Sequence, residues 1–274
     1  MKKYIKVFIY SYKEKDLYDQ ILLLKNNESG TNKVVYYVYD QSNIDREDIF
    51  KDVDGVVYNF VNWNDYRGIS VYRKRVLLSD LSDFYMEVSG IKSIEPDWDV
   101  FLVNNLKGKM VFSGTGSIKI NLDGYFIKKE VSESTEVVLT NYVDMSFIFM
   151  GVNSSILLSK LIDLKGVGQE LLLSLVLIDN KYEIYSVPNE FCSVGSFDYK
   201  VYRPYSIYHG YNKMIESIHL SDTEMFEEIH GIDLKNISKM PYQVDDVQYH
   251  TAVTNLSYLD EGRFLKPYSF ISIV

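Results

Sequence analysis

The sequence predicts an α/β fold, a mixed sheet flanked by helices, with a small helical extension at the C-terminus. Short runs rich in β-branched and aromatic residues alternate with helix-length amphipathic segments over the first 90 residues or so, as in parallel βα units. Polar residues follow the ends of those runs. The chain has 274 residues, 46% hydrophobic and 24% charged, which is an ordinary globular composition that can bury one continuous core.

The N-terminal part contains the clearest strand and helix patterns. Four short apolar runs predict strands at 7–10, 34–39, 56–60 and 84–88. Two segments predict helices between them, at 16–25 and 69–81. The first helix carries a leucine and isoleucine stripe, and the second is basic because it contains Arg73, Lys74 and Arg75.

The pattern changes after residue 110. Alternating polar and apolar residues over 110–143 predict antiparallel strands or hairpins, and a strand is expected at 147–150. A buried helix is expected at 171–178 and a strand at 183–187, which Pro188 ends. From Asn212 onward the pattern is helical and more polar, with Ser221 as an expected N-cap. We therefore predict a domain over 1–211 and a helical extension over 212–274 packed on it.

Charge and composition exclude several classes of protein. A net charge of −9 argues against nucleic-acid binding by bulk electrostatics, but it leaves room for a local basic face. The single cysteine, Cys192, excludes an intramolecular disulfide and a cysteine-based metal site. No window approaches 18 uninterrupted apolar residues and no signal-peptide pattern opens the chain. We expect a soluble protein of the cytoplasm, the host cytoplasm if it is viral, with no membrane partner.

Polar residues follow each of the first four predicted strands. They are Ser11 and Tyr12, Asp40 and Gln41, the segment 62–68, and Ser89 with Gly90. Ligands of open α/β sheets bind at the carboxyl ends of the strands. An acidic side chain there can hold a ribose or a uracil edge, and arginines can bind a diphosphate bidentately. The arrangement suits a nucleotide-sugar.

Several sequence blocks resemble a GlcNAc-transferase family that includes cytosolic hydroxyproline N-acetylglucosaminyltransferases. Residues 7–14 (VFIYSYKE) resemble the family's opening I-x-S-Y-R-D strand, and 66–73 (YRGISVYR) resemble its A-x-G-x-x-x-A-R block. Residues 84–89 with Trp98-Asp99 resemble Y-Y-L-Q-I-D-S-H followed by W-D. Residues 168–170 and 182–188 resemble G-E-E and G-Y-D-x-Y-x-P, and His209-Gly210-Tyr211 resembles H-x-Y. The blocks keep the family's order over roughly residues 5–235.

This resemblance implies a GT-A-like, Rossmann-type fold, a UDP-sugar donor and a divalent metal, Mn or Mg. Glu170 takes the position of the active-site acid, either as the base that accepts the acceptor's proton or as a group that orients the acceptor. His209 and Glu87 are the expected metal ligands. The expected donor-binding residues are Tyr10, Ser11, Tyr12, Asp40, Arg67, Arg73 and Ser89. An alternative for Arg73 is a solvated helix face.

One departure from the family concerns the metal. The family's D-S-H triplet falls on Ser89-Gly90-Ile91, so its aspartate and histidine are missing and Glu87 is the nearest acid. Two D-x-D triplets occur elsewhere. We interpret the first, Asp52-Val53-Asp54, as a solvated turn, and the second, Asp97-Trp98-Asp99, as a helix N-terminus with acids in its first turn, although it could also substitute for the metal triplet.

The predicted function is transfer of a sugar to a hydroxyl of a macromolecule. Bacteriophage DNA with a 5-hydroxymethylated pyrimidine is the favoured acceptor, because 72–75 and a set of lysines could form a DNA-facing patch. Those lysines are Lys107, Lys109, Lys128 and Lys129. The alternatives are a hydroxylated cytosolic protein or a glycan as acceptor, a catalytically dead module that binds nucleotide-sugars or glycans, and a structural or interaction protein.

Overall fold

The computed structural model describes residues 2–12, 16–42, 44–62, 69–79, 81–114, 117–121, 126–130, 135–140, 143–155, 157–158, 169–188 and 190–194. At residues 12, 70, 117–121, 126–130, 169–172 and 175 it describes the backbone alone. The predictions for Arg67, His209 and the extension at 212–274 lie outside these ranges.

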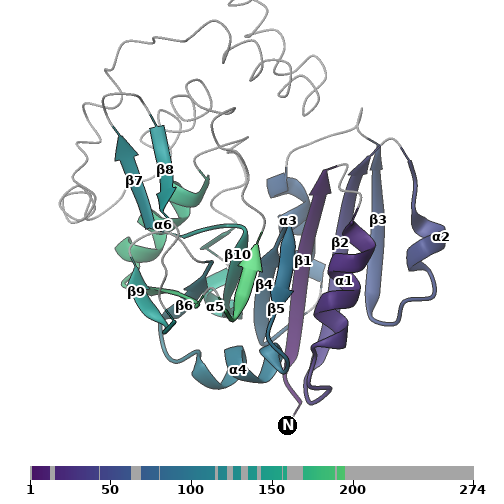
Figure 1. Ribbon diagram of the computed structural model, residues 1–274, viewed down its shortest axis with the longest axis horizontal. Coiled ribbons are helices and arrows are strands. Elements are labelled where there is room, and N and C mark those ends of the chain that lie inside the picture. The colour runs from purple at the N-terminus through teal and green to yellow at the C-terminus, as the bar shows by residue number, and fades with distance from the viewer. Residues whose placement is uncertain are drawn as a thin grey trace, which may run out of the picture.

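The central feature is an eight-stranded mixed sheet with the order β3-β2-β1-β4-β10-β6-β11-β9 (Figure 1). The first four neighbours are parallel, β10 is antiparallel to both β4 and β6, β11 is parallel to β6, and β9 is antiparallel to β11. The strands are β1 (Tyr4–Tyr12), β2 (Lys33–Ser42), β3 (Val56–Asn62), β4 (Phe84–Val88), β6 (Met110–Ser113), β9 (Val138–Thr140), β10 (Phe147–Gly151) and β11 (Glu183–Ser186).

Helices cover both faces of this sheet. They are α1 (Leu17–Asn26), α2 (Glu47–Phe50), α3 (Ile69–Ser79), α4 (Trp98–Asn105), α5 (Val152–Ser155) and α6 (Gln169–Asp179). Alternate residues of a strand point to opposite faces, so β1 feeds two cores. Val7 and Ile9 pack in a cluster with residues of α1 and α4, whereas Phe8 packs in another with residues of α3 and α6.

Two smaller ladders accompany the main sheet. β5 (Ile91–Ile94) pairs antiparallel with β12 (Cys192–Val194), and β7 (Ser117–Asn121) pairs antiparallel with β8 (Phe126–Glu130). The strands and helices predicted in the first 90 residues are all present, with ends that differ from the predicted ones: β1 and β2 are longer, α1 is shifted by one residue, and α3 ends at Ser79. The short helix α2 was not predicted. The region 110–143 contains the predicted antiparallel strands: β7 pairs with β8 as a hairpin, β6 with β10, and β9 with β11. β6 also pairs parallel with β11, which its sequence pattern did not indicate. The β5–β12 ladder was not predicted either.

The two D-x-D triplets have structural roles. Asp97 is the N-cap of α4, and Asp99 lies in the first turn of that helix, which confirms the interpretation as a helix N-terminus. The fully buried Asp99 carboxylate accepts hydrogen bonds from the Ser29 backbone N (2.8 Å), Ser29 Oγ (2.7 Å) and Asn32 Nδ2 (2.8 Å). It thus ties the loop before β2 to α4. Asp52 and Asp54 are exposed in the turn before β3, as expected.

Within the described ranges, none of the helices has both the length and the apolar character that crossing a membrane requires.

Candidate functional site

The sheet has a topological switch point between β1 and β4. The chain adds β2 and β3 on one side of β1 and then places β4 on the other side. In open α/β sheets, ligands bind in the crevice that such a reversal opens at the carboxyl ends of the strands. Ile9 pairs with Val88, the last residue of β4, so Ser11 extends two residues beyond that strand and Ser89 directly follows it. Two predicted donor-binding residues therefore flank this switch point.

Ser11 is the most informative residue at this edge. Its side chain is fully buried, and its Oγ has no hydrogen-bond partner within the described part of the chain. Leaving a buried hydroxyl unsatisfied costs about 1–3 kcal/mol, so such groups call for a physical explanation. A ligand that donates to or accepts from this hydroxyl would supply one.

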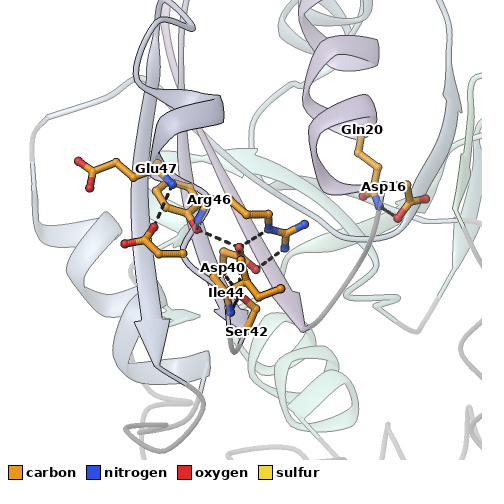
Figure 2. Close-up of polar contacts among 9 residues, drawn as sticks. Asp16, Gln20, Asp40, Ser42, Ile44, Arg46 and Glu47 are labelled. Carbon is orange, nitrogen blue, oxygen red and sulfur yellow. Dashed lines mark hydrogen bonds and ion pairs between the residues drawn. The ribbon is translucent and has the colours of Figure 1, made fainter.

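Asp40 ends up beside Ser11, its partner in the β1–β2 register. Figure 2 shows Arg46 reaching back from the loop after β2 to the Asp40 carboxylate. Arg46 donates from Nη2 to Oδ1 (2.6 Å) and from Nε to Oδ2 (2.7 Å). The Tyr58 hydroxyl donates to Oδ2 (2.9 Å). The Asp40 side chain is fully buried, whereas that of Arg46 keeps 17% of its surface exposed.

The electrostatics of this cluster follow from its geometry. The hydrogen bond to Asp40 raises the pKa of Arg46, and burial beside the same carboxylate raises the pKa of Tyr58 well above its usual range. Both Asp40 oxygens are engaged by these donors. Donor binding through Asp40 stays a prediction, and the geometry favours contact through the more exposed Arg46 over contact through the carboxylate itself.

Arg73 and Glu87 form a buried ion pair. Arg73 donates from Nη2 to Oε1 (2.6 Å) and from Nε to Oε2 (2.7 Å), and the Tyr85 hydroxyl donates to Oε2 (3.0 Å). Their exposed fractions are 1% for Arg73 and 3% for Glu87. Burial lowers the Arg73 pKa, but the Glu87 carboxylate more than offsets this, and burial raises the pKa of Tyr85. Arg73 does not lie on a solvated helix face. The pairing favours a role in fixing α3 to β4 over direct contact with a diphosphate or a metal.

The tyrosines at the end of β1 form an aromatic wall. The Tyr10 hydroxyl donates to Gln41 Oε1, and its ring stacks on Tyr72 of α3 with centroids 6.3 Å apart. Tyr72 in turn packs against Tyr39 (4.8 Å), and the Arg75 guanidinium lies over its ring. Tyr10 is half-buried and lies with Phe8 on the α3 side of the sheet, whereas the Ser11 side chain follows Val7 and Ile9 to the α1 side. For Tyr12, the structure places the backbone opposite Gln41.

A buried carboxylate next to Ser89 was missed from the sequence. Ser89 N donates to Ser146 O (3.0 Å), and Asp144 Oδ1 accepts from the Ser146 backbone N (3.0 Å) and Oγ (2.6 Å). A Cβ built on Gly114 would lie 2.9 Å from Asp144 Oδ2, so a glycine is required there. The D-x-S pattern before a predicted strand, which is typical of an Asx turn, is the signal that could have indicated Asp144.

The residues of the described part do not fit a divalent ion. They contain no group of three or more His, Cys, Asp or Glu side chains that could hold a metal. Both oxygens of Glu87, one of the two predicted ligands, are engaged by Arg73 and Tyr85.

Glu170 is the second residue of α6, and the structure describes its backbone. The strand after α6, β11, is parallel to β6, which itself runs in the direction of β4. A helix that leads into such a strand begins near the carboxyl edge of the sheet, so Glu170 lies toward the edge that carries Ser11 and Ser89.

Comparison with known proteins places this arrangement among glycosyltransferase folds. No family model matches the chain, and no curated protein matches its sequence. Residues 1–349 of S. aureus TarS superpose with a TM-score of 0.53 at 12% identity, covering 94% of this chain and 81% of that one. GalNAc-T7, crystallised with UDP, GalNAc and Mn²⁺, superposes with a TM-score of 0.54 at 12% identity and covers 87% of this chain. The chain spans 56% of the GalNAc-T7 chain.

Both proteins are glycosyltransferases of the GT-A type, and the mixed sheet with its flanking helices has this fold. The fold predicted from the sequence is therefore confirmed.

Proposed function

We propose that the protein is a glycosyltransferase that moves a sugar from a UDP-sugar to a hydroxyl of a macromolecular acceptor. The observation that carries the proposal is the buried Ser11 hydroxyl at the switch point of a GT-A sheet, which has no hydrogen-bond partner among the residues that the structure describes. The crevice between β1 and β4 is where this type of sheet binds ligands. Similarity to GalNAc-T7, which was crystallised with UDP and GalNAc, supports the nucleotide-sugar donor.

The donor would lie across the ends of β1, β2 and β4. Neighbouring strands are about 4.8 Å apart, so the ends of β2 and β4 are separated by roughly 10 Å, which suits an extended nucleoside diphosphate. In this proposal Ser11, Ser89 and the backbone near Tyr12 contact the donor, and Tyr10 provides an aromatic wall. Asp40 acts through Arg46, and Arg67 is retained as a proposed diphosphate ligand.

Glu170 is the proposed catalytic acid or base. The start of α6 at Gln169, in a helix that leads into β11, supports a position of Glu170 near an approaching acceptor hydroxyl. A divalent cation, Mn or Mg, belongs to the proposal because GalNAc-T7 was crystallised with Mn²⁺. His209 is the remaining proposed ligand, since Glu87 is engaged by Arg73.

For the acceptor we favour a 5-hydroxymethylated pyrimidine in bacteriophage DNA. The lysines predicted to form one patch lie at two edges of the sheet: Lys107 and Lys109 precede β6 at the amino edge, whereas Lys128 and Lys129 belong to the β7–β8 hairpin, which follows the carboxyl end of β6. Arg73, from the basic stretch 72–75, is buried in its ion pair with Glu87. The hairpin therefore supports the DNA proposal and Lys107 does not. A hydroxylated protein or glycan is the alternative acceptor.

A catalytically dead nucleotide-sugar-binding module is the second candidate. The engagement of Glu87 in an ion pair, at the position nearest the family's metal triplet, is the observation that favours it.

The deciding experiment is a UDP-release assay over a panel of UDP-sugars, with Mn²⁺, Mg²⁺ or EDTA, with and without DNA containing 5-hydroxymethylcytosine. We expect release that the modified DNA stimulates. Release that is indifferent to DNA would keep the transferase and move the acceptor to protein or glycan. UDP binding without any release would support the dead module, and absence of both would refute the proposal.

A further inference from the structure

The segment 143–146 lies at the carboxyl edge of the sheet, between the candidate donor site and α6. It leads into β10, which is antiparallel to β4, and Phe147 at the start of β10 pairs with Val88 at the end of β4. Asp144, in the middle of this segment, exposes 2% of its surface. A buried segment outside the ladders needs partners for its backbone amides, and side chains from neighbouring elements can supply them.

Two serines from other elements hold the backbone of this segment. Ser174 Oγ of α6 accepts a hydrogen bond from Val143 N (2.8 Å), and Ser113 Oγ at the end of β6 accepts one from Asp144 N (2.7 Å). Both serine side chains are fully buried. Removing either acceptor would leave a buried amide without this hydrogen bond, which is costly. The serines therefore fix the segment to α6 and to β6.

The Asp144 carboxylate fixes the other end of the segment. Its Oδ1 accepts hydrogen bonds from Ser146 N (3.0 Å) and Ser146 Oγ (2.6 Å). Ser146 O in turn accepts one from Ser89 N (3.0 Å). Gly114 leaves room for the carboxylate, since a Cβ at that position would lie 2.9 Å from Asp144 Oδ2. A continuous set of buried contacts thus joins Ser89 after β4 to Ser174 in α6.

We propose that Asp144 is a positioning residue, which holds the start of α6 at a fixed place relative to Ser89. Glu170 lies four residues, about one helical turn, before Ser174 in α6. A displacement of about 1 Å between reacting groups can lower a rate about a hundredfold. The contacts of segment 143–146 therefore set where the proposed catalytic acid meets the donor. The inference rests on the sugar transfer and the role of Glu170 proposed above.

The test compares variants that break these contacts with matched variants at the amino edge. Ser174→Ala and Asp144→Ala each remove an acceptor that holds the segment. Their controls are Ser155→Ala and Asp99→Ala, which remove the same groups from equally buried side chains near the amino edge. For each protein, kcat is measured by UDP release with the UDP-sugar and acceptor that the wild type uses fastest. Calorimetry gives the Kd of UDP, and thermal unfolding gives Tm.

We expect Ser174→Ala and Asp144→Ala to lower kcat by about tenfold to a hundredfold. The Kd of UDP should stay within about threefold of the wild type, because the groups that would contact the donor remain. Asp99→Ala and Ser155→Ala should lower Tm to a similar extent as their counterparts and leave kcat within about twofold. A loss of rate that accompanies any loss of stability would therefore be recognised from the controls.

Two further variants separate positioning from proton transfer. Asp144→Asn keeps an oxygen that can accept from Ser146, so kcat should stay within about threefold of the wild type, whereas a carboxylate that moved the proton itself could not be replaced in this way. Ser174→Ala should have almost no further effect in a Glu170→Gln background, within about twofold, because residues that act as a unit are not additive.

The inference and the proposed function fail in different ways. Wild-type protein that transfers sugar, with Ser174→Ala and Asp144→Ala at full kcat, would overturn the inference and leave the function standing. Controls that lose as much rate as their counterparts, a large loss in Asp144→Asn, or an undiminished effect of Ser174→Ala beside Glu170→Gln would also overturn it. Wild-type protein that binds no UDP would refute the proposed function, and the inference with it.

Discussion

Arg73 of α3 and Glu87 of β4 face each other in the interior as a bidentate ion pair, with Nη2–Oε1 and Nε–Oε2 distances of 2.6 and 2.7 Å. Removing either partner leaves a buried charge without compensation, so we expect Arg73→Ala or Glu87→Ala to lower the free energy of unfolding by about 3–5 kcal/mol. Urea denaturation would measure it. The exposed neighbour provides a control, since Lys74→Ala should change stability by less than about 0.5 kcal/mol. A double Arg73→Met/Glu87→Leu variant should be more stable than either single variant, and a greater loss in the double would contradict this account.

Ser11→Ala should change stability and donor binding in opposite directions. Removing a buried hydroxyl that has no partner among the described residues should stabilise the fold by up to about 1–3 kcal/mol, whereas losing a hydrogen bond to the donor should weaken UDP binding by about fivefold to tenfold. Thermal unfolding and calorimetric titration with UDP would measure the two effects. The control is Ser155→Ala, because Ser155 Oγ donates to Val152 O at the far edge of the sheet and its loss should leave UDP binding unchanged. Unchanged UDP affinity in Ser11→Ala would remove Ser11 from the donor site.

Asp40 and Arg46 should act as a unit in donor binding. We expect Asp40→Ala to weaken UDP binding because Arg46 loses its two hydrogen bonds to the Asp40 carboxylate, and Arg46→Ala to weaken it by a similar factor. A double-mutant cycle on UDP affinity should therefore give a coupling free energy of about 1–3 kcal/mol. Strictly additive effects would mean that Asp40 contacts the donor independently of Arg46, and no effect from either would place the nucleotide elsewhere.

Stability should respond to pH through Glu28. Burial raises the pKa of this carboxyl above its usual 4.5, against the opposing effect of the hydrogen bond from the Tyr36 hydroxyl. The folded state therefore binds the proton more tightly than the unfolded state, so the contribution of Glu28 to stability is present below about pH 4.5 and is lost as the pH rises through the folded pKa. As the pH rises from below about 4.5 through the folded pKa, the unfolding midpoint should fall more steeply for the wild type than for Glu28→Gln. Parallel pH profiles would show that Glu28 is not responsible.

Glu170→Gln should reduce sugar transfer by at least about a hundredfold, because the variant cannot take up or give a proton. UDP binding should remain within about twofold, since the proposed role concerns the acceptor. Initial rates of UDP release and calorimetry would separate the two quantities. The exposed Glu190 offers a control, and Glu190→Gln should leave both unchanged. Full activity in Glu170→Gln would show that another residue is the catalytic acid.

Local patterns predicted much of the fold. Strands β1 to β4 and helices α1, α3 and α6 were recognisable because their periodicity is written in contiguous residues. The N-terminal role of Asp97 in α4 was also predictable, since a proline and two acids precede an apolar helical segment. Ser11 and Ser89 could be placed at one edge because carboxyl ends of parallel strands share an edge.

The partners of the charged residues were not predictable. Arg73 follows a pattern that looks solvent-exposed, with Lys74 and Arg75 beside it, and its partner Glu87 is 14 residues away on a strand. Asp40 could be assigned to a strand end, but its enclosure by Arg46 and Tyr58 depends on how β2, β3 and the intervening loop pack. Burial of a charge is decided by a partner that sequence spacing does not reveal.

The class of fold and the order of its elements follow from short-range periodicity, and strand direction predicts the edge of the sheet at which a ligand is expected. Three features could be read only from the folded chain: β6 lies between β10 and β11, Arg73 and Asp40 are each paired with a charged partner, and the Ser11 hydroxyl is buried without a partner in the described residues. Those facts arise from contacts between residues distant in the chain. Such contacts are selected by the free energy of packing the whole domain, and local sequence carries no signature of them.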